Sequence, residues 1–190
     1  MPRLEIIIAS TRPGRVGRTV GDWFAEAARE HGGFDVHVTD LAELDLPFHD
    51  EPHHPAQHNY VHDHTKRWSE IITAADAVVF VMPEYNFSFS GVLKNAVDFL
   101  YREWAYKPVG FVSYGGASGG MRAVHAFRPV MSTLRAYPLA ASVAIPFVRN
   151  HLDENGVFSA TSEVEGAAKT MLDELAKLAP VMAQLHSPAQ

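Results

Sequence analysis

The chain has 190 residues, of which 47% are apolar and 20% are charged, values that are ordinary for a globular domain. Its formal net charge of -6 argues against a nucleic-acid-binding surface. Because it contains no cysteine, disulfides, thiolate metal sites and cysteine nucleophiles are excluded. No stretch reaches the roughly 20 apolar residues that span a bilayer. We therefore expect one cytoplasmic domain over residues 1–190, with a loose tail at its last few residues.

Short apolar runs alternate with amphipathic segments along the chain. Strands are predicted over residues 4–10, 34–41, 77–82, 108–114 and 139–148. Helices are predicted over residues 17–31, 65–75, 91–104, 119–135 and 162–185. Three of the strands are continuously apolar, which indicates a five-stranded parallel sheet covered by helices on both faces, a doubly wound α/β fold. For one short domain we expect the strand order 2-1-3-4-5, with a ligand at the carboxyl ends of the strands.

The first strand ends in STRPGRVG, residues 10–17, at the start of a helix. Free backbone N–H groups and the helix dipole favour an anion there, and Arg12 and Arg15 add permanently charged donors that suit phosphate. The alternative is a capped helix with a solvated basic turn. The loop has neither the GxxxxGK[ST] nor the GxGxxG spacing, so a terminal monophosphate is favoured over a nucleoside triphosphate or a dinucleotide.

Two further loops are expected at the same edge of the sheet. MPEYN, residues 82–86, offers backbone N–H groups, a ring and an amide, and SYGGASGG, residues 113–120, has four glycines that let the backbone approach a flat ligand. Either loop alone could be a simple connection between a strand and a helix. Together, the three loops predict a site for a flat, hydrogen-bonding ring system that carries one phosphate, as FMN does.

The motifs STRPGR, PEYN followed by LKNAVDF, and SYGG resemble those of the NADPH-dependent FMN reductase family, which has a flavodoxin-like fold. The resemblance runs from about residue 4 to residue 148. Where the family commonly has histidine and proline, this chain has Phe87 and Ser90, which bears on its electron acceptor. The resemblance implies that the FMN phosphate is held by Ser10, Arg12, Arg15, Val16 and Gly17, one side of the flavin by Pro83, Glu84, Tyr85 and Asn86, and its other edge by Ser113, Gly115 and Gly116.

The same resemblance implies a homodimer or homotetramer in which NADPH, or NADH, passes hydride through bound FMN to a small acceptor. Free flavin, a quinone, an azo compound and a metal oxyanion are all open as acceptors. Since the flavin carries the chemistry, no side chain is assigned as a catalytic acid or base, and Glu84 is interpreted as a helix-capping or interface residue. The main alternative is a flavodoxin-type electron carrier, against which the arginines of the first loop argue.

A second alternative is a metal-binding or regulatory protein, suggested by six histidines between residues 49 and 64. The pairs His54/His58 and His58/His62 would share a helix face and could hold zinc or nickel. Pro52 and Pro55 oppose a helix at the start of this segment. We therefore favour exposed histidines of a polar loop and expect no metal site.

Overall fold

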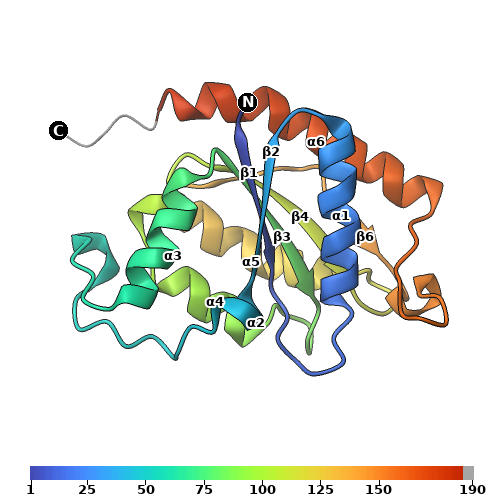
Figure 1. Ribbon diagram of the computed structural model, residues 1–190, viewed down its shortest axis with the longest axis horizontal. Helices are drawn as coiled ribbons and strands as arrows, with labels where there is room; N and C mark the ends of the chain where they lie inside the picture. The colour runs from blue at the N-terminus through green and yellow to red at the C-terminus, as the bar shows by residue number, and fades with distance from the viewer. Residues whose placement is uncertain (186–190) are drawn as a thin grey trace.

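The computed structural model describes residues 1–185, so the tail expected at the last few residues lies outside the described part. Its centre is a parallel sheet in the order β2-β1-β3-β4-β5, with β6 also paired to β4 (Figure 1). This confirms the predicted flavodoxin-like order. The strands are β1 (Arg3–Ile8), β2 (Asp35–Asp40), β3 (Ala77–Pro83), β4 (Pro108–Tyr114), β5 (Tyr137–Pro138) and β6 (Val143–Ile145).

Helices cover both faces of the sheet, α1 and α6 on one face and α3, α4 and α5 on the other (Figure 1). The α-helices are α1 (Gly17–His31), α2 (Leu41–Leu44), α3 (Asp63–Ala74), α4 (Gly91–Asp98), α5 (Met121–Thr133) and α6 (Ser162–Ala183). Short 3-10 helices are η1 (Pro55–Gln57), η2 (Arg102–Trp104) and η3 (Val148–His151). None of the helices within residues 1–185 is both long and apolar enough to cross a membrane.

The continuous apolar strands pack against both helical layers, because successive side chains point to opposite faces of a sheet. In β3, Val79 and Val81 pack toward α1 and α6, whereas Phe80 packs toward α4 and α5. All seven residues of β3 are buried, as are all seven of β4. Because β3 and β4 are parallel, their carboxyl ends come to the same edge of the sheet.

The last strand was predicted over residues 139–148, but only β6 lies in that range; β5 comes just before it, and both strands pair with β4. Tyr137 pairs with the start of β4 and Val143 with its end. Pro138 cannot donate to a sheet hydrogen bond, and the Arg128 guanidinium lies within hydrogen-bond distance of the carbonyls of Pro138 and Ala140. Arg128 thus contacts the backbone between the two short strands.

Two other predictions differ from the structure. The helix predicted over 91–104 ends at Asp98 and is followed by η2. The histidine segment forms no continuous helix before α3: residue His58 has a φ of 53° after η1, so the two predicted histidine pairs do not share a helix face. Among residues 1–185, no three histidine, aspartate or glutamate side chains come together to hold a metal ion.

Two buried carboxylates fix the histidine segment, Glu103 from outside the segment and Glu51 from within it. Glu103 is 4% exposed and accepts hydrogen bonds from the hydroxyls of Tyr60 and Ser69 at 2.8 and 2.7 Å. Glu51 accepts the backbone N–H groups of Val61 and His62 at 2.8 and 3.0 Å. These contacts give the segment a structural basis that needs no metal.

Candidate active site

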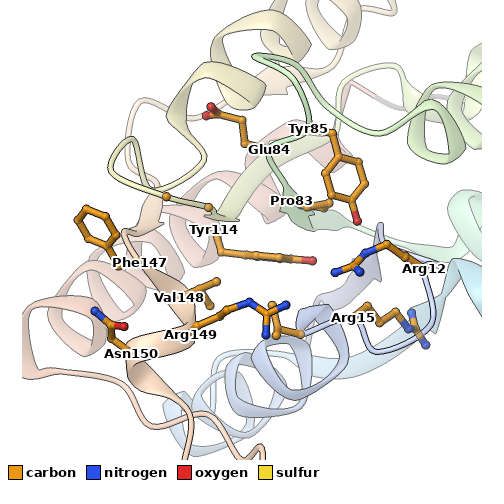
Figure 2. Close-up of a pocket in the computed structure, with 13 residues that line it drawn as sticks. Arg12, Arg15, Pro83, Glu84, Tyr85, Tyr114, Phe147, Val148, Arg149 and Asn150 are labelled. Carbon is orange, nitrogen blue, oxygen red and sulfur yellow. The ribbon is translucent and has the colours of Figure 1, made fainter.

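A cavity of about 450 Å³ opens at the carboxyl ends of β1, β3 and β4, within the volume range of small-molecule sites (Figure 2). It is the edge at which the three motif loops were predicted to meet. A fourth segment, the start of η3 after β6, also contributes to the wall. Residues predicted from the motifs that line the cavity are Arg12, Arg15, Val16, Pro83, Glu84, Tyr85, Gly115 and Gly116.

Four predicted residues do not line the cavity itself. Ser10 and Gly17 are buried beneath it. Asn86 is exposed in the turn after Tyr85, and the Ser113 hydroxyl donates to the carbonyl of Gly119 at 2.9 Å, away from the cavity. The side chain of Ser113 points to the opposite face from Tyr114 because neighbours in a strand alternate.

The lining also includes residues that the motifs did not predict. Tyr114 is the last residue of β4, and alternation along that strand was a signal that could have identified it in place of Ser113. The others follow β6, another parallel strand whose carboxyl end reaches the same edge. These are Phe147, Val148, Arg149 and Asn150.

The start of α1 is open to an anion. Its N-cap residue, Val16, supplies no side-chain hydrogen bond, and its first turn holds no acidic residue, so the free N–H groups of that turn are available to a ligand. Tyr114 and Ser10 are 4% and 1% exposed, yet within residues 1–185 neither hydroxyl has a hydrogen-bond partner in good geometry. Buried hydroxyls without partners are unfavourable, which indicates that a polar ligand group completes them.

The two hydroxyls lie close together beside Gly17, without the geometry of a hydrogen bond. A Cβ at position 17 would collide with both, so glycine is required by close approach. Burial raises the pKa of the Tyr114 phenol above its ordinary value, which keeps it protonated as a neutral donor. Figure 2 shows this hydroxyl between the guanidinium groups of Arg12 and Arg149.

Arg15 has a different role from Arg12, although both belong to the same motif. The Arg15 guanidinium makes two hydrogen bonds of 2.6 Å to the carboxylate of Asp40 at the end of β2, and it also donates to the carbonyl of Ser10. Burial opposes ionisation of Asp40, but its bonds to Arg15 and to the N–H of Ala42 outweigh this and lower its pKa. Arg15 therefore holds the loop to β2, and its charge is already compensated.

Glu84, like Arg15, is paired with other residues of the protein. Its carboxylate accepts hydrogen bonds from the Ser118 hydroxyl at 2.7 Å and from the backbone N–H of Arg122 at 3.2 Å. It also forms an ion pair with the Arg122 side chain at 2.9 Å. In Figure 2 the carboxylate points away from the centre of the cavity. The PEYN loop is thereby fastened to the first turn of α5, as expected for a helix-capping glutamate.

A tight turn follows Tyr85. Asn86 and Phe87 have φ angles of 47° and 74°, and Tyr85 and Ser88 exchange backbone hydrogen bonds of 2.8 and 2.9 Å. Two positive φ angles suit asparagine and glycine better than phenylalanine. The Phe87 ring is 67% exposed and lies 4.5 Å from the Arg122 guanidinium, measured to the ring centroid. This contact holds the turn in place and leaves Tyr85 at the rim of the cavity.

The strand order and this cavity define a flavodoxin-like α/β protein with an anion-binding end and a wall suited to a flat ring. The sequence model of the NADPH-dependent FMN reductase family matches residues 2–150, so the chain belongs to this family of flavin-dependent oxidoreductases, which use FMN and a reduced nicotinamide.

Similar proteins agree with this assignment. The chain is 32% identical over 169 residues to an NAD(P)H-dependent FMN reductase of Nectria sp, covering 86% of this chain and 82% of the relative. It is 40% identical over 121 residues to one of Schizosaccharomyces pombe, covering 63% of this chain and only 60% of the relative. A solved structure of FerB, an NAD(P)H:(acceptor) oxidoreductase of Paracoccus denitrificans, superimposes with a TM-score of 0.77 at 17% identity, covering 96% of this chain and 99% of that one, and this similarity supports the fold.

The donors in the cavity fit FMN. A phosphate matches the open start of α1, the Arg12 guanidinium and the unpartnered hydroxyls of Ser10 and Tyr114. A flat ring system matches the walls formed by Pro83 and Tyr85 and by the glycine backbone after β4.

Proposed function

We propose that the chain transfers reducing equivalents from NADPH or NADH through FMN, bound in this cavity, to a small planar organic acceptor. The observation that carries the proposal is that unpartnered polar groups suited to a phosphate lie at a cavity at the carboxyl ends of β1, β3 and β4, whose walls include Pro83, Tyr85 and the glycine backbone after β4. Bound FMN would supply the hydride- and electron-transfer chemistry between the nicotinamide and the acceptor. The residues of the chain bind it, orient it and exclude water from one side.

The chain itself contributes positioning. In this proposal Arg12 and the first turn of α1 hold the phosphate, and the neutral Tyr114 hydroxyl donates a hydrogen bond at the same end. The backbone at Gly115 and Gly116 approaches the flavin edge without side-chain obstruction. Glu84 fixes the relative position of the loops after β3 and β4 through its hydrogen bond with Ser118.

A planar organic acceptor is favoured by the walls of the cavity. Tyr85 and Phe147 line it and keep 40% and 55% of their surface exposed, so a flat molecule can stack against them. Relatives named as a quinone reductase of Pseudomonas putida, 48% identical over 69 residues, and an NADPH azoreductase of Bacillus sp., 27% identical over 146 residues, support the same class. Steady-state rates with a quinone, an azo dye, free flavin and chromate test this proposal. The highest kcat/KM is expected with the quinone, and turnover with chromate alone would contradict it.

Replacing Arg12 by alanine is expected to weaken FMN binding about 10- to 100-fold, because a charge-assisted contact to phosphate is lost. Flavin fluorescence titration measures the change in Kd. Arg67→Ala, which removes an exposed arginine from α3, is the control and should leave the Kd unchanged. If Arg12→Ala retains flavin as tightly as the control does, the phosphate does not bind at this end of the cavity.

A further inference from the structure

Arg149 brings a second cation into the cavity from outside the three motif loops. It lies in η3, after β6, and its guanidinium points into the cavity toward Arg12 and the Tyr114 hydroxyl (Figure 2). Across residues 1–185, no ion pair joins the side chain of either Arg12 or Arg149 to a carboxylate. Both guanidinium groups are thus available to a ligand.

The charges that line the cavity leave these two arginines uncompensated. Arg15 is paired with Asp40, and Glu84 is paired with Arg122. A phosphate monoester carries about -1.5 to -2 charges at neutral pH, which two guanidinium groups balance and one does not. In a chain with a net charge of -6, two free cations that point toward the unpartnered hydroxyl of Tyr114 indicate an anion site.

The backbone around Arg149 is fixed relative to both walls of the cavity. The N–H groups of Phe147 and Val148 donate to the carbonyls of Gly116 and Gly115 at 3.0 and 3.2 Å. Further along, the Phe158 N–H donates to the Thr19 hydroxyl of α1 at 2.9 Å. The start of η3 is therefore bonded to the loop after β4, and the segment that follows η3 is bonded to α1, which fixes the backbone on both sides of Arg149.

We propose that Arg149 is the second phosphate-binding arginine of the site and acts together with Arg12. The motif pattern assigned this role to Arg15, which the structure uses to hold the loop to β2. The inference rests on the proposed binding of FMN in this cavity. It assigns the phosphate group to donors from two distant parts of the chain, the loop after β1 and η3.

Binding of FMN compared with riboflavin, which lacks the phosphate, tests this assignment. For Arg149→Gln we expect the Kd for FMN to rise about 10- to 100-fold while the Kd for riboflavin changes less than about threefold. Arg149→Lys keeps the charge without the bidentate fork and should recover part of the FMN affinity. Arg29→Gln, at the far end of α1, is the charge-matched control. Thermal melting of each variant confirms that it is folded.

Three results would overturn the assignment. Equal weakening of FMN and riboflavin would mean that Arg149 contacts the ring or only shapes the loop. An unchanged Kd for FMN would exclude a contact with its phosphate, and an accompanying rise in KM for NADPH but not for NADH would assign Arg149 to the 2′-phosphate of NADPH. If the unmodified protein binds neither flavin, the proposed function itself fails, which separates that failure from failure of the Arg149 assignment.

Discussion

Replacing Asp40 by alanine is expected to lower the free energy of unfolding by about 2–4 kcal/mol, because it leaves the Arg15 guanidinium without its partner. The Asp40 side chain is 1% exposed and that of Arg15 is 17% exposed, which places the effect slightly below that of a fully buried pair. Denaturant unfolding at pH 7 measures it. The pKa of Asp40 is lowered by folding, so this stabilisation is present above the unfolded pKa of about 4 and is lost as the pH falls below it.

Two variants control this prediction. Arg18→Gln removes the other arginine near Asp40, but its side chain is 47% exposed, so a change below about 1 kcal/mol is expected. The double variant Arg15→Met/Asp40→Leu removes both charges and should recover much of the stability that Asp40→Ala loses. An Asp40→Ala variant as stable as Arg18→Gln would show that the ion pair does not hold the loop after β1.

Replacing Lys107 by methionine is expected to remove a pH dependence of stability on the alkaline side. Lys107 is 3% exposed and donates to the carbonyl of Ala75. Burial lowers its pKa to about 8, an effect that Asp76 and Glu103 oppose only in part. Between pH 8 and about 10.4 the unfolded chain binds more protons than the folded protein, so stability rises with pH over this range. A shift of this size corresponds to about 3 kcal/mol.

The difference in unfolding free energy between Lys107→Met and the unmodified protein is the quantity to measure at pH 7 and pH 10. The unfolding free energy of Lys107→Met minus that of the unmodified protein should fall by about 2.5 kcal/mol, since only the unmodified protein gains stability over this range and pH 10 lies just below the unfolded pKa. The buried phenols of Tyr60 and Tyr114 are present in both proteins and cancel in the difference. Lys177→Met, on the exposed side of α6, should show no such change. A constant difference for Lys107→Met would mean that Lys107 is charged in the fold throughout.

Much of the fold was predictable from local pattern. Successive residues of β1, β3 and β4 pack alternately into two core layers. Such strands can be recognised in the sequence as continuous apolar runs, because both of their faces are buried. The short β5 and β6 were not separable in the sequence, because each is defined by its pairing with a different part of β4. Their pairing with β4 is long-range information that a local pattern does not contain.

The location of the candidate site was predictable from the sequence, but the full set of residues that line it was not. The rule that ligands bind at the carboxyl ends of parallel strands located the cavity. Motif spacing could not separate Arg12 from Arg15, because the partner of Arg15 is Asp40, 25 residues further along the chain. Nor could it include Arg149, which reaches the cavity only because η3 packs against the loop after β4.

The most direct test of the central claim is the anaerobic absorbance spectrum of the FMN-reconstituted protein before and after one equivalent of NADPH. We predict that the flavin bands bleach and return when a quinone is added. Bound flavin that neither NADPH nor NADH bleaches would contradict the reductase function and indicate an electron carrier. Absence of any flavin binding would contradict the site itself.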